Sequence, residues 1–264
     1  SGIRLEGKIH IVTAAISATQ NIINCIRRCG LNVNDIILEQ LASGHAVLTE
    51  DEKQLGVCLI DIGGGTTDIA VYTDGAIRHT AILSVAGEHV TNDLAVAFRT
   101  PHQNAEAIKI KYGCAMHALA DKSNNVNLPS VGLHGEQQVS QANLAEIIEP
   151  RMEELFALIL EELQRSGWDG LLSAGIVLTG GSAKMHGLLE LAAKIFQSHV
   201  RLGVPRYTVG MPAIVNNPSY ATGIGLVLYG SKTQDVPLHE TIEKPKLRVN
   251  EVFVRVKNWF QGNF

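Results

Sequence analysis

The spacing of apolar residues along the chain follows the two periods that mark strands and helices. Alternating or continuous apolar runs predict strands at Lys8–Thr13, Asp35–Gln40, Gly56–Asp61, Asp68–Thr73, Ala76–Val85 and Ile176–Thr179. Apolar residues with a helical period predict helices at Ser17–Gly30, Leu41–Leu48, Asn104–Tyr112, Asn143–Ser166, Met185–Phe196 and Ser219–Tyr229. This mixture indicates α/β layers around a mixed sheet.

Three stretches between these elements have their own signals. Thr49–Lys53 is charged and predicts an exposed turn, and Lys122–Gln141 predicts short strands or a loop. Pro150 predicts a kink or a restart in the longest helix. The buried stripe predicted for that helix consists of Met152, Leu155, Phe156, Ile159 and Leu163.

Composition and charge narrow the class of protein. The 264 residues are 45% hydrophobic and 18% charged, enough for one large or two small cores. No apolar run reaches about 18 residues, so no transmembrane helix is predicted. A net charge of -4 argues against nucleic acid as a main partner. Four cysteines in a chain of this length fit a reducing cytosol. Ser1 in place of Met indicates a fragment or a processed form.

A glycine-rich loop joins two of the predicted strands. Gly63, Gly64 and Gly65 follow Asp61 and precede Thr66 and Thr67. Glycines let the backbone take positive φ and let a ligand reach the N–H groups, and the threonines add hydroxyl donors. Asp61 is well placed to hold Mg²⁺ through water. A phosphate-binding loop is favoured over the alternative, a hairpin turn with a glycine bulge.

Further candidates for a nucleotide site lie later in the chain. Gly180, Gly181 and Ser182 follow a strand and precede a helix, and Gly87 follows another strand. Glu106 and Lys109 are three residues apart on one predicted helix. They would hold a ribose and an adenine edge, or else form an ordinary surface ion pair.

The order of these motifs resembles the actin-like ATPase superfamily. The resemblance implies that DIGGGTTD is the second phosphate loop and that the LTGG turn meets adenosine. ILEQLASGHAVL looks like the first connecting helix of that superfamily, which implies that Glu39 lies near the metal and the attacking water. ATP and Mg²⁺, the latter held by Asp61 via water, are the implied cofactors.

Longer motifs narrow the match to one family. VLTEDEKQLGVCLIDIGGGTTDIAVYTDGAIRHT, HVTNDLAVAFRTP, AEAIKIKYGCA, LAEIIEPRMEEL and AGIVLTGGSAKMHGL resemble the bacterial cell-division family FtsA over almost the whole chain. The resemblance implies a polymerising protein at the cytoplasmic face of the inner membrane, at the division septum. It would anchor the FtsZ ring there and help recruit later division proteins.

The same resemblance implies a division into subdomains. The fold class expected is α/β, an actin-like (ribonuclease H-like) ATPase fold, incomplete at the N-terminus, with an inserted α+β subdomain and a C-terminal amphipathic helix. Residues 1–56 with 213–230 would be the remainder of the first subdomain, and 57–87 with 171–212 the second, which carries the nucleotide loops. Residues 88–170 would be the insert that receives the FtsZ C-terminal tail. Arg151 is carried over as its contact; a solvated helix charge is the alternative.

The C-terminal end predicts a membrane contact. Residues 231–247 hold two prolines and scattered charges and predict a linker. Residues 248–264 predict an interfacial amphipathic helix with a local charge of +3 − 1 = +2. A helix docked on the protein's own core is the alternative. The apolar face expected to enter lipid consists of Val249, Val252, Phe253, Val256, Trp259, Phe260 and Phe264.

One departure from the family affects the expected activity. FtsA chains carry a first phosphate hairpin and a small subdomain before the region that matches Ser1. We therefore expect weak ATP binding, weak or no ATPase activity, and less self-association than the family implies. An actin-fold small-molecule kinase is the alternative, although no aspartate base is evident and the tail counts against it. A third interpretation is a scaffold protein that binds its partners and the membrane without ATP chemistry.

Overall fold

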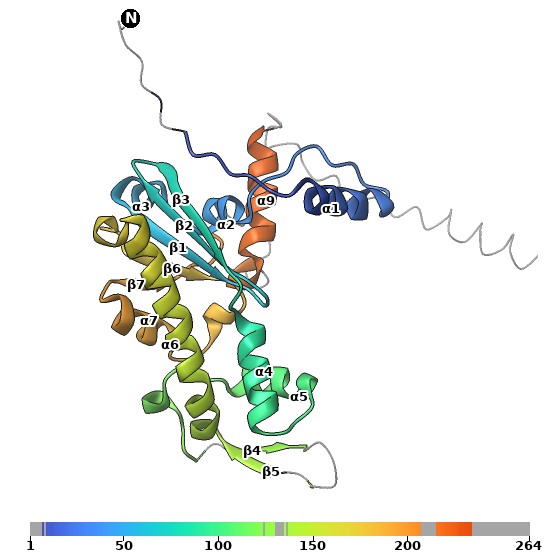
Figure 1. The fold of residues 1–264 in the computed structure, drawn as a ribbon, viewed down its shortest axis with the longest axis vertical. Helices are drawn as coiled ribbons and strands as arrows, with labels where there is room; N and C mark the ends of the chain where they lie inside the picture. The colour runs from blue at the N-terminus through green and yellow to red at the C-terminus, as the bar shows by residue number, and fades with distance from the viewer. Residues whose placement is uncertain are drawn as a thin grey trace, which may run out of the picture. The chain divides into compact units, whose positions relative to one another are not determined.

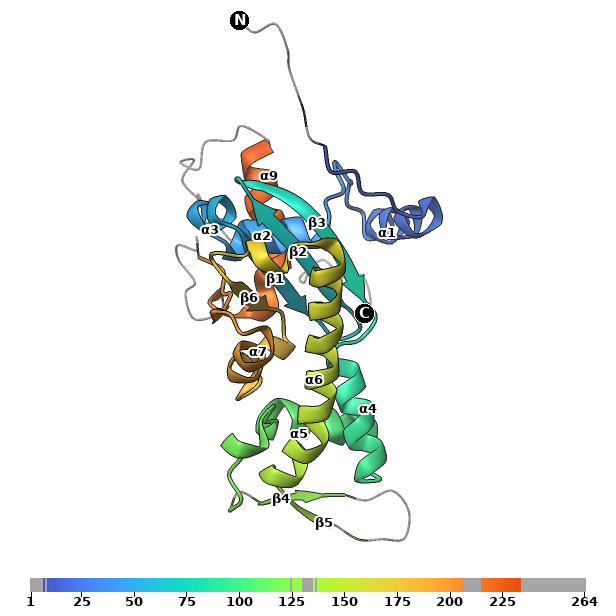
Figure 2. The same cartoon turned by 60° about the vertical axis from the view of Figure 1, so that its left-hand side comes forward.

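The computed structural model describes residues 7, 9–123, 125–129, 135, 137–206 and 215–233. The chain divides into two compact units, Ser1–Gly230 and Ser231–Phe264. The first unit contains nearly all of the described residues, and its elements are shown from two sides in Figures 1 and 2. Of the second unit, only residues 231–233 are described.

A five-stranded mixed sheet forms the centre of the first unit, as the alternation of elements predicts. Its strand order is β3 (Ala76–Leu83), β2 (Thr67–Thr73), β1 (Val57–Ile62), β6 (Ile176–Thr179), β7 (Val200–Leu202). The pairs β1–β2 and β2–β3 are antiparallel, whereas β1–β6 and β6–β7 are parallel. The short strand β7 is not predicted from the sequence. Figure 1 shows the sheet with helices on both of its faces.

Each face of the sheet has its own apolar core because successive strand residues point to opposite sides. Cys58, Ile60 and Ile62 of β1 belong to the larger core, with residues of α6 (Gln141–Ser166) and α7 (Leu188–Phe196). Val57 and Leu59 belong to the smaller core, with residues of α2 (Glu39–Val47) and α9 (Ala221–Thr233). By the same alternation Asp61 lies on the side of α2 and α9.

A long insertion between β3 and β6 forms a second group of elements. It contains α4 (Gly87–Ala97), α5 (His102–Tyr112), the hairpin of β4 (Asn125–Leu128) and β5 (Gln137–Ser140), and α6. Figures 1 and 2 both show α4, α5 and the hairpin around the N-terminal half of α6, away from the sheet. Residues from α4, α5 and α6 share the larger core. The insertion is therefore continuous with the sheet through α6.

Helix α6 is a single element with Pro150 inside it, so of the two predicted alternatives, a kink or a restart at Pro150, the restart is wrong. Ser140 caps its N-terminus through a reciprocal hydrogen bond pattern with Asn143. A proline removes one backbone hydrogen bond from a helix interior. Packing along the whole helix offsets this loss, because all five residues of the predicted stripe are buried: Met152, Leu155, Phe156, Ile159 and Leu163.

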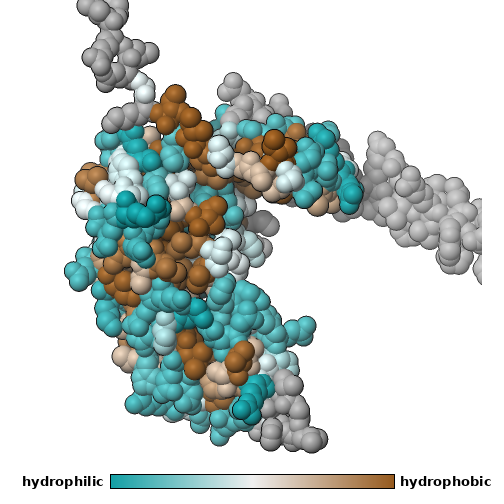
Figure 3. Space-filling view, viewed as in Figure 1, coloured by the Kyte–Doolittle hydropathy of each residue, from teal (hydrophilic) through white to brown (hydrophobic). Residues whose placement is uncertain are grey.

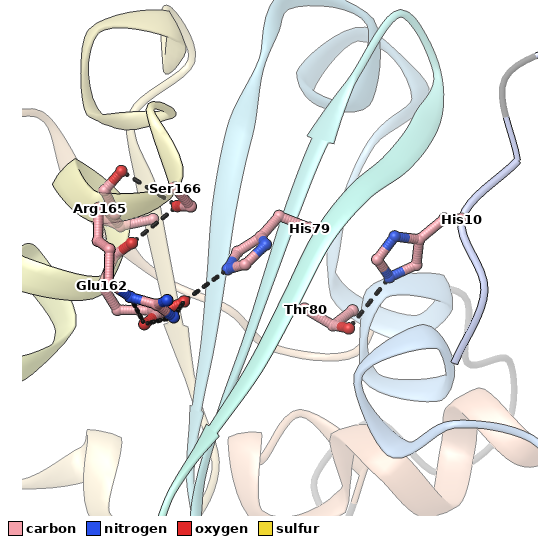
Figure 4. Close-up of polar contacts among 7 residues, drawn as sticks. His10, His79, Thr80, Glu162, Arg165 and Ser166 are labelled. Atoms are coloured by element: carbon pink, nitrogen blue, oxygen red, sulfur yellow. Dashed lines mark hydrogen bonds and ion pairs between the residues drawn. The ribbon is translucent and has the colours of Figure 1, made fainter. Parts of the chain in front are cut away.

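The contacts of β3 show how this edge strand is held on both faces. His79 Nε2 lies 2.9 Å from Glu162 Oε1 of α6, and His10 Nε2 lies 3.1 Å from Thr80 Oγ1 (Figure 4). The two histidine contacts lie on opposite sides because neighbouring strand residues alternate. Glu162 also accepts a hydrogen bond from Arg165 Nη2. The hydrogen bonds from Arg165 and His79 lower the pKa of Glu162, although partial burial opposes this shift.

The N-terminal segment differs most from the sequence prediction. Residues 9–15 form no strand, and neither do residues 35–38 before α2. A strand needs a neighbour to pair with, and these residues form no backbone ladder with the described sheet. Helix α1 (Ile16–Arg28) forms as predicted but has no buried residue. The exposed apolar residues of this helix and of the preceding segment include Ile9, Ile11, Ile16 and Ile22. Figure 3 shows apolar surface in brown along this part of the molecule.

The turn predicted at Thr49–Lys53 is also wrong, because a short helix, α3 (Glu50–Leu55), forms there. The Thr49 hydroxyl accepts from the backbone N–H of Glu52, and the Glu52 carboxylate accepts from the backbone N–H of Thr49. This capping box satisfies two N–H groups that a helix end leaves free. A charged stretch is therefore helical because it carries its own cap.

Candidate functional site

The turn between β1 and β2 leaves three residues open to solvent. Gly64, Gly65 and Thr66 are exposed, and the backbone N–H of Gly63 donates to the carbonyl of Thr66 at 3.0 Å. None of the three glycines has a positive φ, contrary to the sequence expectation. A Cβ on Gly64 or Gly65 would meet no atom of the protein within 4 Å. Neither a positive φ nor packing against the protein requires glycine at these two positions, so their backbone is open to close approach by a ligand.

Three of the candidate segments converge on the carbonyl of Gly63. The backbone N–H of Gly87 donates to it at 3.1 Å, and the Ser182 hydroxyl donates to it at 3.0 Å. The backbone N–H of Glu88 donates to the carbonyl of Gly64 at 2.8 Å. A Cβ on Gly87 would lie 2.4 Å from Ser182 Oγ, so glycine is required there for contact within the protein itself.

Lys109 and Glu106 join the same cluster from α5. Lys109 Nζ lies 2.6 Å from Glu106 Oε2 and donates to the Gly87 carbonyl at 2.9 Å and to Thr91 Oγ1 at 2.8 Å. Thr91 in turn donates to Glu106. Burial alone would raise the pKa of Glu106, but the hydrogen bonds from Lys109 and Thr91 lower it. The pair is not an ordinary surface ion pair, because Lys109 is buried and uses its three donors inside the protein.

Asp61 is buried at the end of β1. The Ser43 hydroxyl donates to Asp61 Oδ2 at 2.6 Å, and the Thr222 hydroxyl lies 3.4 Å from the same oxygen. Burial raises the pKa of Asp61, and the charge of Glu39 raises it further. Gly180 has φ +90, and a Cβ there would lie 2.5 Å from Asp61 Oδ1. Gly180 is therefore required by backbone conformation and by space.

Asp68 lies directly opposite Asp61 in the β1–β2 ladder. Burial, then the charge of Glu39, raises the pKa of Asp68 to about 6. Gln40 Nε2 donates to Asp68 Oδ1 at 2.7 Å. Glu39 is exposed at the start of α2, with Thr222 Oγ1 3.4 Å from its Oε1, and its position near a metal stays a prediction. Together these groups form a carboxylate cluster, defined here as Glu39, Asp61 and Asp68.

Four side chains of this region are absent from the sequence prediction: Gln40, Ser43, Thr91 and Thr222. Gln40 and Ser43 come from α2 and Thr222 from α9, so α2 and α9 contribute polar groups at the end of the smaller core. The only sequence signal for Gln40 and Ser43 is their position inside ILEQLASGHAVL, the stretch that resembles the connecting helix. Nothing local marks Thr222, because its role depends on α9 packing beside α2.

A metal would find oxygen donors here and no preformed cage. Across the ranges that the structure covers, no group of three or more His, Cys, Asp or Glu side chains is arranged to hold a metal ion directly. Carboxylate, hydroxyl and amide oxygens are the donors that a hydrated Mg²⁺ ion accepts. The donor set therefore fits a cation that keeps its water.

Arg151, the candidate partner contact, is engaged within the protein. Its Nε and Nη2 donate to Asp93 of α4 at 2.6 and 3.0 Å, and Nη1 donates to Glu154. The hydrogen bond to Asp93 raises the pKa of Arg151. The guanidinium borders a surface depression lined by Asp93, Glu146, Ile147, Pro150, Arg151 and Glu154. Arg151 is therefore fixed in place rather than a freely solvated charge.

The residues predicted to enter lipid lie outside the described residues, as do 207–214 and most of the predicted linker: Val249, Val252, Phe253, Val256, Trp259, Phe260 and Phe264. Within the described ranges, none of the helices combines the length and the apolar character needed to cross a bilayer.

Comparison with known structures supports an actin-like fold. The chain superposes on MreB5 of Spiroplasma citri bound to ADP with a TM-score of 0.68 and 19% identity, covering 84% of this chain and 69% of that one. It superposes on the MamK double helical filament with a TM-score of 0.62 and 17% identity, covering 85% and 66%. The fold is therefore the mixed α/β fold of the actin-like proteins.

Comparison of sequences is more specific. A relative from Pseudomonas aeruginosa, "Cell division protein FtsA", is 55% identical over 271 residues, and its counterpart from Escherichia coli is 42% identical. Both alignments cover 100% of this chain and 64% of the relative, so the chain spans less than two thirds of their length. The family model "Cell division protein FtsA" matches residues 58–225. The chain belongs to the FtsA family of cell division proteins.

Proposed function

We propose that this chain is the nucleotide-binding and partner-binding part of a cell-division protein that anchors the FtsZ ring to the inner membrane. The observation that carries the nucleotide part is the convergence of the β1–β2 turn, Gly87 and Ser182 on the Gly63 carbonyl. The family membership carries the cell-division part. It also disfavours the alternative, an actin-fold small-molecule kinase.

The phosphates of ATP would lie against the β1–β2 turn. Gly64, Gly65 and Thr66 are exposed there, and the Cβ positions of the two glycines face open space. Backbone N–H groups that are free of side chains bind phosphate oxygens well. Solved structures with the same fold support this assignment, since MreB5 was solved bound to ADP and bound to AMPPNP.

The sugar and base would lie near Glu106 and the Gly180–Ser182 turn. Glu106 is the polar group best able to accept from ribose hydroxyls, because it stays ionised and is 38% exposed. Lys109 acts as a positioning residue, since its donors are used on Gly87, Thr91 and Glu106. Mg²⁺, when bound, would neutralise phosphate charge, and Asp61 would hold its water shell from the β1 side.

Partner binding, lipid binding and self-association are inferred from family membership and from the predicted C-terminal amphipathic helix. The insertion at residues 88–170 would receive the acidic FtsZ tail at Arg151, and residues 248–264 would contact lipid. Self-association is supported by the fold shared with a filament-forming protein, MamK. Together these contacts would place the protein at the cytoplasmic face of the membrane at the septum, where it would recruit later division proteins.

The nucleotide proposal is tested by Gly64→Ala. The added Cβ meets no protein atom and the backbone φ is not positive, so the free energy of unfolding should change little. A methyl group at this turn obstructs the phosphate, and losing one charge-assisted hydrogen bond costs about 1.5–3 kcal/mol. The dissociation constant for Mg-ATP should therefore rise by about tenfold or more.

Fluorescence titration with labelled ATP, up to millimolar concentrations, measures this change. Gly170→Ala is the matched control, because Gly170 is also exposed, lacks positive φ and has no atom near its Cβ position. It should bind ATP as the wild type does. Equal affinity of Gly64→Ala and wild type, or no ATP binding by the wild type, would rule out the phosphate assignment.

A further inference from the structure

The amide oxygen of Gln40 is exceptional among the buried groups. Of the buried side-chain polar atoms in the described residues, it is the single one without a hydrogen-bond partner. Gln40 is 1% exposed, so bulk water does not reach this oxygen. A buried acceptor that stays unpaired costs about 1–3 kcal/mol. Such a group in a folded protein calls for an unseen partner.

The orientation of the Gln40 amide is fixed by its neighbours. Its Nε2 donates to Asp68 Oδ1 at 2.7 Å, and the Tyr72 hydroxyl donates to the Gln40 backbone carbonyl at 3.3 Å. Flipping the amide would place its oxygen against the Asp68 carboxylate and break this hydrogen bond. The unpaired atom is therefore the oxygen, an acceptor that needs a donor.

The surroundings decide what kind of donor fits. Gln40 is next to Glu39 in the chain and bonded to Asp68, which lies opposite Asp61. Within the part of the chain that the structure describes, no Lys, Arg or His forms an ion pair with any member of this carboxylate cluster. An anion would be repelled here, and an apolar group would leave the oxygen unpaired. A lone water would supply only the O–H donor, whereas a hydrated cation supplies both an O–H donor and the positive charge that the carboxylates lack.

We propose that Gln40 is a positioning residue for a hydrated divalent cation: its Oε1 accepts a hydrogen bond from one of the cation's waters while its Nε2 holds Asp68. The inference rests on the proposed Mg-ATP binding at the β1–β2 turn. The inference adds a contact from α2 to the β1–β2 turn, made through the cation and its water, that forms only when the cation is bound. A cation-dependent contact of this kind would make ATP affinity depend on Gln40.

Two substitutions separate the oxygen from the rest of the side chain. Gln40→Met removes the amide and keeps a similar length and volume. Gln40→Glu keeps an oxygen acceptor at the same distance from the backbone, loses the donor to Asp68 and adds a negative charge, which also favours a cation. Gln54→Met on α3 is the matched control, because the Gln54 side chain is exposed. Circular dichroism and thermal melting establish that each variant is folded.

The measurement is the affinity for labelled ATP as a function of free Mg²⁺, with EDTA as the metal-free point. Losing a group that orients a metal's ligands lowers metal affinity by about 10- to 100-fold. Because this contact runs through water, we expect the smaller change. Gln40→Met should need about 10-fold more free Mg²⁺ to reach the same ATP affinity as the wild type, and its ATP affinity in EDTA should be unchanged. Gln40→Glu and Gln54→Met should need no more free Mg²⁺ than the wild type to reach the same ATP affinity.

Each other outcome has a distinct meaning. A wild type that binds Mg-ATP, with Gln40→Met showing the same Mg²⁺ dependence, overturns the inference and leaves the nucleotide proposal standing. ATP binding that ignores Mg²⁺ in the wild type also overturns it. Loss of the Mg²⁺ dependence in Gln40→Glu as well would show that the oxygen is not the acting group. A wild type that binds no ATP overturns both the inference and the proposed function.

Discussion

Glycines in the candidate site are present for different physical reasons. Gly180 has a positive φ and lies against Asp61, and Gly87 lies against Ser182, so both are required by the protein's own packing. Gly64 and Gly65 face open space with ordinary backbone angles. The sequence shows all of them only as glycine-rich turns. Only their surroundings separate the glycines that the protein's own packing requires from the two that face open space.

Arg151 gives a prediction at the same scale. An acidic partner peptide must replace or join the carboxylates of Asp93 and Glu154, which already accept from its guanidinium. Reversing the charge in Arg151→Glu removes this donor and adds a third repelling carboxylate. We expect loss of binding of a synthetic FtsZ C-terminal tail peptide, measured by fluorescence anisotropy.

Arg165→Glu on the same helix is the matched control, since Arg165 is 72% exposed and lies outside the depression beside Arg151. It should bind the peptide as the wild type does. Thermal melting checks the fold of both variants. Peptide binding by a folded Arg151→Glu protein at wild-type affinity would contradict the assignment of Arg151.

The helices and strands that the sequence predicts correctly are those set by a single hydrophobic period together with a local turn or cap. The hairpin β1–β2 has continuous buried strands on both sides of its turn, and α6 keeps its stripe for its full length. The predicted strands near residues 9–13 and 35–40 failed because a strand also needs a partner, which no local pattern supplies. Helix α3 escaped prediction although Thr49 and Glu52 form a capping box, a signal visible in the sequence.

The contact between α3 and β7 predicts a pH dependence. Arg201 Nε and Nη2 donate to the Glu52 carboxylate at 2.6 and 2.8 Å. Burial alone would raise the pKa of Glu52, but hydrogen bonds from Arg201 and Thr49 lower it from 4.5 to about 2. A lowered pKa stabilises the fold above pH 4.5, and this contribution is lost as the pH falls towards 2.

Arg201→Met should therefore lower the free energy of unfolding at neutral pH by about 2 kcal/mol. The difference from wild type should shrink between pH 4.5 and 2, as Glu52 becomes protonated in both proteins. Urea denaturation at several pH values measures it. Lys194→Met is the control, because Lys194 and Glu153 are 4.0 Å apart and both well exposed. A wild-type advantage that is independent of pH would contradict the role of Glu52.

At the scale of the whole molecule, the sheet brings distant segments together. Residues of α2, the β1–β2 turn, α4, α5, the Gly180–Ser182 turn and α9 meet at one end of β1. Parallel pairing of β1 with β6 places Asp61 beside Thr179, just before Gly180. The subdomain limits expected from the family stay a prediction.

Membrane attachment is the prediction at this scale. As a helix, residues 248–264 are predicted to have an aromatic apolar face and a mildly basic polar face, a pattern typical of helices that bind a lipid interface without spanning it. Trp259→Glu places a charge on the apolar face and should abolish flotation with vesicles of zwitterionic and anionic phospholipids. Asn258→Glu adds the same charge off the stripe and should float like wild type. A wild type that stays in solution, or floating Trp259→Glu protein, would refute the attachment.

The sequence by itself determined the α/β class, the β1–β2 hairpin, the long helix, the family and most of the candidate residues. These features depend on local period, turn chemistry and long motifs, which are present before folding. Only the tertiary structure decided that Lys109 uses its donors internally, that Arg151 is paired with Asp93, and that Gln40 Oε1 is unpaired. Each of these depends on which groups from distant segments become neighbours and which are removed from water, and no local pattern encodes that.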